Sequence, residues 1–216
     1  MKESEIIERL SKNLSPVEPL WPMGQRLLFG SFIIISISLF VFMRFWGVRD
    51  DLHEQLNNIW FLVQMGLCAS LIVIGVLCSF KFSIPRVKPP AAWIFGMILL
   101  HMGLLICLLG FLKTDPHEHI NFQRFWNYFY MPCIRAVALF SLVAVIIYGF
   151  LIRRSLTTYP LATGFFLFSA AAAFGVFAVS LYCGSCDPIH ILTSHFIPMI
   201  LFSGLGLIFG KIFLRW

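Results

Sequence analysis

Six apolar runs, each close to the length that crosses a lipid bilayer, take up most of this chain of 216 residues. They cover residues 27–43, 59–80, 91–112, 131–152, 161–182 and 191–210, with short polar breaks between them. A helix needs roughly 20 apolar residues to cross the hydrocarbon core, where its backbone polar groups must bond to one another. The runs therefore predict an all-α, polytopic integral membrane protein with six transmembrane helices.

The remaining residues are too few for a soluble catalytic domain. Hydrophobic residues make up 59% of the chain and charged residues 12%, far from the usual soluble composition. We expect two parts, a polar segment over 1–26 and a membrane domain over 27–216. No phosphate-binding loop, nucleophile elbow or zinc-protease motif occurs in the sequence, which argues against an enzyme. No carboxylate pair lies within the runs, which argues against a transporter driven by intramembrane acids.

The basic residues predict how the chain is oriented. Eleven Lys and Arg residues lie in the amino-terminal segment, the second and fourth loops and the carboxyl-terminal tail, against four in the other three loops. Because cytoplasmic loops carry the excess of Lys and Arg, both termini should be cytoplasmic. The net charge of +6 then reflects topology, and it indicates no direct nucleic-acid partner.

The amino-terminal segment combines a short amphipathic stretch with a proline-rich linker. Its apolar residues recur at roughly helical spacing before the prolines stop any helix. Such a helix either lies on the membrane surface or docks into a groove on a soluble partner, and composition does not choose between the two. The candidate partner-binding residues are Ile6, Ile7, Leu10, Leu14, Pro16 and Pro19.

Chemistry-bearing residues concentrate between the last two runs, in the stretch LYCGSCDPIHILTSH from Leu181 to His195. Cys183 and Cys186 form a C-x-x-C pair, which can make a tight disulfide or shift the thiol pKa. With imidazoles nearby, the thiolates could also form a soft site for zinc, cadmium or copper(I). His190 and His195 are five residues apart, about 140° around an α-helix, so they cannot be assumed to share a ligand.

Cys133 begins the fourth run, and the predicted topology puts it at the same membrane level as the C-x-x-C pair. The candidate metal ligands are therefore Cys133, Cys183 and Cys186, and His190 and His195 join them as candidate redox- or metal-sensing residues. Two other hypotheses stay open. The cluster could be an inert structural disulfide with interfacial histidines, or Cys183 and Cys186 could serve a membrane thiol-disulfide oxidoreductase.

Other polar or thiol residues carry weaker hypotheses. Arg135 lies about one turn inside the fourth run, close enough to the interface to snorkel, and His101 fits a hydrogen-bonded packing residue. His117 and His119 lie in an acidic loop that is better explained as solvated. The cysteines buried among apolar neighbours are expected to act as small hydrophobes, and they are Cys68, Cys78 and Cys107.

Three features of the whole chain resemble a known family. A cytoplasmic segment with Leu10 and Leu14, followed by SPVEPLWP, precedes the six runs, and the basic turn SIPR follows the second run. The chain closes with a hairpin from Cys183 to Trp216 that ends in Leu-Arg-Trp. Together these features are similar to the NrsF-type bacterial membrane anti-sigma factors, which restrain an extracytoplasmic-function (ECF) sigma factor.

The resemblance implies a function and a set of partners. It implies a protein of the bacterial inner membrane that holds an ECF sigma factor on the cytoplasmic side and releases it on heavy-metal or oxidative stress. The two cysteines implicated in sensing match Cys133 and Cys183 here, and Cys186 is an addition to that pattern. No resident cofactor is implied, only a transient heavy-metal ion as a signal, and the oligomeric state stays open.

Overall fold

The computed structural model describes residues 11, 21–85, 87–114, 131–153, 155 and 157–215. Within these ranges every regular element is helical. In chain order they are α2 (Met23–Phe45), α3 (Leu52–Gln55), α4 (Ile59–Phe82), α5 (Ala91–Thr114), α7 (Met131–Arg153), α8 (Pro160–Ser180), α9 (Pro188–Ile191), the π-helical turn η1 (Leu192–Phe196) and α10 (Ile197–Phe213).

Among the described residues, six helical segments are long and apolar enough to cross a membrane, which confirms the predicted all-α, six-span class. The first and sixth spans begin earlier in the structure than the sequence predicted. The first span begins at Met23 rather than Leu27, because the buried Arg26 is accommodated inside the helix. The sixth begins at Pro188 rather than Ile191, because Pro suits the first turn of a helix and Asp187 caps it.

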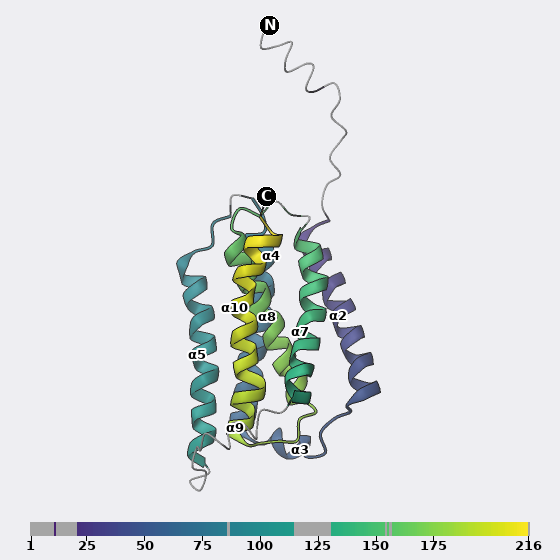
Figure 1. Ribbon diagram of the computed structural model, residues 1–216, viewed down its shortest axis with the longest axis vertical. Helices are drawn as coiled ribbons and strands as arrows, with labels where there is room; N and C mark the ends of the chain where they lie inside the picture. Colours follow the sequence, from purple (N-terminus) through teal and green to yellow (C-terminus); the bar gives the residue numbers. More distant parts are fainter. Residues whose placement is uncertain are drawn as a thin grey trace.

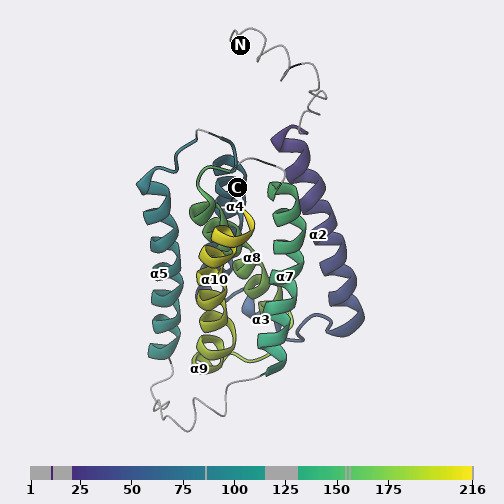
Figure 2. The same cartoon turned by 45° about the horizontal axis from the view of Figure 1, so that its top comes forward.

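Helix α8 is the centre of the bundle, with α4, α7 and α10 packed around it and α2 and α5 at the periphery (Figures 1 and 2). Most of the residues in its span are buried, a far larger share than in any of the other five spans. Its small side chains make this possible, since they let neighbouring backbones approach closely. The small buried residues of α8 are Gly164, Ser169, Ala170, Ala171, Ala172, Ala173, Gly175, Ala178 and Ser180.

Glycines set the closest contacts of α8. A Cβ built on Gly206 of α10 would lie 2.5 Å from the carbonyl oxygen of Gly164 and 2.6 Å from the Cβ of Phe168. About three turns further along α8, a Cβ on Gly175 would lie 2.5 Å from the hydroxyl of Ser141 in α7. Only glycine leaves room for backbones this close.

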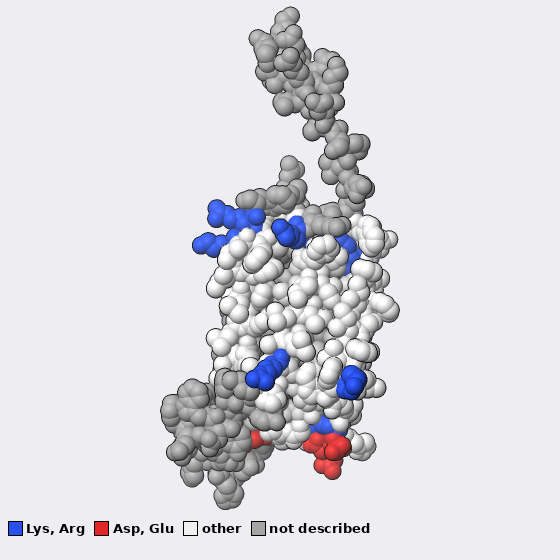
Figure 3. Space-filling view, turned by 45° about the vertical axis from the view of Figure 1, so that its right-hand side comes forward, with Lys and Arg blue, Asp and Glu red and all other residues white. Residues whose placement is uncertain are grey.

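The two ends of the bundle differ in charge (Figure 3). The four acidic residues of the described part of the chain, Asp50, Asp51, Glu54 and Asp187, all lie in loops or the short α3 at one end. The opposite end, where the chain terminates, carries most of the described basic residues: Arg26, Lys81, Lys88, Arg153, Lys211 and Arg215. We call these the acidic end and the basic end.

Helix α2 is fastened to α7 near the basic end. The Arg26 guanidinium donates to the hydroxyl of Ser155 at 2.8 Å and to the carbonyl of Leu151 at 3.3 Å. Further along, the hydroxyls of Ser31 and Tyr148 lie 2.6 Å apart. The predicted amino-terminal docking residues, from Ile6 to Pro19, lie outside the described residues, and α2 is the helix that follows them.

Candidate functional site

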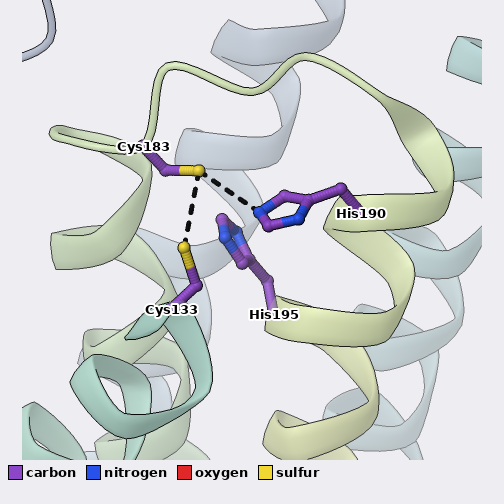
Figure 4. Close-up of side chains that lie close together, drawn as sticks. All are labelled: Cys133, Cys183, His190 and His195. Carbon is purple, nitrogen blue, oxygen red and sulfur yellow. Dashed lines mark hydrogen bonds between the residues drawn. The ribbon is translucent and has the colours of Figure 1, made fainter. Parts of the chain in front are cut away.

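Two cysteines from distant parts of the chain meet at the acidic end of the bundle. Cys133 lies in the first turn of α7, and Cys183 lies in the loop just after α8. The thiol of Cys133 donates to the sulfur of Cys183 at 3.7 Å, and both residues are buried (Figure 4). This is the pair that the family resemblance implied.

Two histidines complete the group from the start of the sixth span. Asp187 caps the short helix α9, accepting from the backbone N–H groups of Ile189 at 2.7 Å and His190 at 3.2 Å. This cap fixes His190 so that its Nε2 lies 3.4 Å from the sulfur of Cys183. The rings of His190 and His195 lie edge to face, with centroids 5.4 Å apart.

A π-helical turn explains why two histidines five residues apart come together. In η1, the backbone N–H of Ile197 bonds the carbonyl of Leu192, five residues back. Residues at that spacing come nearly into line on a π-turn, whereas on an α-helix they diverge. The regular α-helical geometry used for the sequence expectation therefore does not apply here, and His190 and His195 do lie within reach of a common ligand.

The four side chains have the composition and spacing of a soft-metal site. One ligand atom from each of Cys133, Cys183, His190 and His195 lies within 4.8 Å of all the others. Zinc held by two sulfurs at about 2.3 Å in a tetrahedron would place those sulfurs roughly 3.8 Å apart, close to the 3.7 Å between these two. All four residues are buried, as in closed tetrahedral sites.

The ring of His195 adds an independent observation. Only 2% of this residue is exposed, yet neither Nδ1 nor Nε2 has a partner at hydrogen-bond geometry, although the ring lies beside the Cys183 sulfur. A buried polar group without a partner is costly, so it calls for an explanation. A ligand held between His195 and the two sulfurs would supply the missing interaction.

The electrostatics of the group favour a thiolate at Cys183. Its pKa lies well below the usual value, first because the Cys133 thiol donates to its sulfur and then because the His190 ring lies against it. The thiolate is the form of cysteine that binds metals and attacks oxidised sulfur. Cys183 is thus prepared for either reaction.

Cys186 lies apart from the four-residue group. It is exposed, and Nη2 of Arg49 donates to its sulfur at 3.2 Å. The sequence had placed it among the metal ligands, but the four ligand atoms that converge do not include its sulfur.

The weaker candidates lie elsewhere. Cys68, Cys78 and Cys107 are buried inside spans. His101 bonds the Met97 carbonyl at 2.7 Å and reaches the Ser203 hydroxyl at 3.5 Å, as a packing histidine would. Arg135 is exposed on α7, and the loop with His117, Glu118 and His119 lies outside the described residues.

The loop after α2 belongs to the site, although the sequence interpretation left it out. Trp46 stacks on Tyr182 with ring centroids 5.3 Å apart, and the Arg49 backbone N–H donates to the carbonyl of Leu181 at 3.0 Å. The Arg49 side chain is held by Asp51 through two bonds of 2.6 and 2.7 Å. The sequence did offer one indication of this role. Arg49 is a basic residue in a loop predicted to lie outside the cytoplasm, where basic residues are few.

The chain matches the family described as "NrsF: Negative regulator of sigma F" over residues 10–216. It belongs to this family. No curated protein and no solved structure matches the chain. The family description establishes a negative regulator of a sigma factor, with a sigma factor as its partner, built on six membrane-spanning helices.

Proposed function

We propose that this NrsF-family protein is a membrane-bound anti-sigma factor and not an enzyme. It sequesters an ECF sigma factor at the bacterial inner membrane. It releases the sigma factor when its four-residue site responds to heavy metal or oxidant. The single observation that carries the sensing part is the convergence of two buried cysteines and two buried histidines at one end of the bundle. The family match supplies the sigma-factor partner.

The charge difference between the two ends supports the proposed orientation. Basic residues gather at the end where the chain terminates, and the described acidic residues gather at the other. By the positive-inside rule, the basic end faces the cytoplasm together with both termini, where the sigma factor is. The Cys/His site then faces outward, where oxidants and metal ions arrive first.

The chemistry of the four side chains indicates which kinds of signal the site would respond to. Two thiolates and two imidazoles suit zinc, cadmium and copper(I) and discriminate against magnesium and calcium, which prefer oxygen. An oxidant would act on the cysteines at the same end of the bundle by joining two of them, one being Cys183, as a disulfide. Either event changes the separation of α7 from the segment that links α8 to α10.

Transmission has a continuous path across the membrane. Cys133 begins α7, Cys183 follows α8, and the turn containing His195 leads directly into α10. All three helices run from the site to the basic end, where α7 is bonded to α2 through Arg26. A 100-fold weakening of sigma binding requires about 2.8 kcal/mol of difference between the two states, which one metal–thiolate site can supply.

The test is co-purification from the native membrane. We expect a sigma factor to accompany the gently solubilised full chain and to be absent when residues 1–22 are deleted, because the candidate docking residues Ile6, Ile7, Leu10, Leu14, Pro16 and Pro19 lie there. Adding Cd²⁺ should release the sigma factor from the full chain but not from a Cys133→Ser or Cys183→Ser variant. Adding an oxidant should release it from the full chain but not from Cys183→Ser.

The outcomes separate the parts of the proposal. A full chain that inserts normally but carries no sigma factor would contradict the anti-sigma role. A truncated chain that still carries it would move the docking surface to the cytoplasmic loops. Release that is unchanged in both cysteine variants would contradict sensing at this site.

A further inference from the structure

A small cavity connects the buried site with the outside of the protein. It measures about 20 Å³, room for one water molecule, and its lining includes the buried residues Cys183, His195 and Arg49 and the exposed Cys186. Cys133 does not line it. A small reagent from the solvent, such as hydrogen peroxide, therefore meets the exposed Cys186 before it meets the buried sulfurs of the four-residue group.

Cys186 has the surroundings of a reactive thiol. All six cysteines are among the described residues, and it is the only exposed one. The Arg49 guanidinium lies 3.2 Å from its sulfur, and the side chain of Arg49 is only 4% exposed. Arg49 is held there as a permanent cation, because its bonds to Asp51 raise its pKa above the usual value. Reactive cysteines characteristically combine partial exposure with a neighbouring positive charge.

We propose that Cys186 is the peroxide-reacting thiol of this protein and that Cys183 resolves it, so that oxidation enters the site as a Cys183–Cys186 disulfide. This deepens the proposed function, on which it rests for its physiological meaning, by assigning the oxidant a different first target from the metal. The His195 ring, buried, unpartnered and on the cavity wall, marks the inner end of the same path.

The chemistry balances in two steps. The Cys186 thiolate attacks one oxygen of hydrogen peroxide, the O–O bond breaks, and hydroxide leaves and is protonated to water, so Cys186 becomes a sulfenic acid. The Cys183 thiolate then attacks the Cys186 sulfur, an S–S bond forms, and the S–O bond breaks with loss of a second hydroxide that is protonated to water. Overall, two thiols and one peroxide give one disulfide and two waters.

Local structure allows the second step. Cys183 and Cys186 are separated by Gly184 and Ser185 in a segment that lies outside the helices, and a Cβ on Gly184 would meet open space. The disulfide removes one sulfur from the four-residue group, and Cys133, His190 and His195 are left without it.

The experiment uses the purified, metal-free full chain in detergent, treated with a small excess of hydrogen peroxide. Sulfenic acid is trapped with a dimedone probe, and disulfides are mapped by mass spectrometry. We expect a Cys183–Cys186 disulfide in the unsubstituted protein and a trapped sulfenic acid on Cys186 in Cys183→Ser. In Cys186→Ser we expect loss of rapid oxidation at Cys183. Cys78→Ser, which replaces a buried thiol beside Lys81 at the basic end of the bundle, serves as the matched control and should behave as the unsubstituted protein.

Two results would overturn the proposal. One is a Cys133–Cys183 disulfide that forms in Cys186→Ser as fast as any disulfide forms in the unsubstituted protein. The other is a Cys186 that stays unlabelled in Cys183→Ser. Because Cys186 is exposed, its serine variant should fold, and a cadmium titration of that variant checks this independently. The readout is chemical and needs no sigma factor, so its failure is distinguishable from failure of the anti-sigma role.

Discussion

Replacing His195 by leucine should weaken cadmium binding about 100-fold or more while leaving the metal-free protein at least as stable as before. Affinity falls because one of four ligands is gone, and even losses in the surroundings of a metal cost 10–100-fold. Stability is kept or gained, by up to about 1–3 kcal/mol, because leucine is of similar size and relieves two buried ring nitrogens that have no partner. A histidine with a purely structural role would show the opposite pattern.

His101→Leu is the matched control for this prediction. His101 is also a histidine within a span, but its nitrogens have partners in the Met97 carbonyl and the Ser203 hydroxyl. Its leucine variant should lose stability, on the order of 1 kcal/mol, and keep its cadmium affinity. Thermal unfolding in detergent and titration against a competing chelator measure the two quantities. Cadmium bound equally tightly by His195→Leu would refute the four-ligand site.

Changing Gly206 to alanine should lower the free energy of unfolding of the helical bundle by about 1–3 kcal/mol or more. This is the usual cost of overpacking a well-filled interior. The added methyl group would lie 2.5 Å from the carbonyl oxygen of Gly164 and 2.6 Å from the Cβ of Phe168. The first contact involves backbone, which no change of rotamer can move away. Helices α8 and α10 would have to separate.

Gly204→Ala is the control for Gly206→Ala, since it makes the same substitution two residues earlier in the same helix. A Cβ on Gly204 meets nothing within 4 Å, so this variant should be neutral or slightly stabilised. The melting temperatures of the two variants in one detergent provide the comparison. Equal melting temperatures would mean that α8 and α10 do not pack as closely as described.

Hydropathy was enough to predict the fold class, because the bilayer requires long apolar helices and this requirement is local in sequence. The packing around α8 also had a local signal that the sequence interpretation did not use. Gly206 and Gly210 are four residues apart, the small-residue spacing typical of close helix pairs. The start of the sixth span could also have been predicted, because Asp187 followed by Pro188 is a typical helix start.

The site itself could be predicted only in part. The concentration of Cys and His between Leu181 and His195 was visible, and the resemblance supplied Cys133. The pairing of His190 with His195 was not predictable, because it depends on a π-helical turn with no clear sequence signature. The place of Cys186 beside Arg49 depends on a contact between loops 137 residues apart in sequence, which periodicity does not report.

The central position of α8 has a consequence for how the protein is made. A helix whose residues mostly contact other helices gains little from lipid alone, and Pro160–Ser180 and Pro188–Phe213 have the lowest mean hydropathy of the six spans. Its closest partner, α10, follows it in the chain, so α8 must enter the membrane before that partner exists. The four-residue group is likewise incomplete until His195 has been synthesised. Nascent chains that stop short of α10 should therefore be recognised by membrane quality-control proteases, and cadmium binding should appear only once His195 has been synthesised.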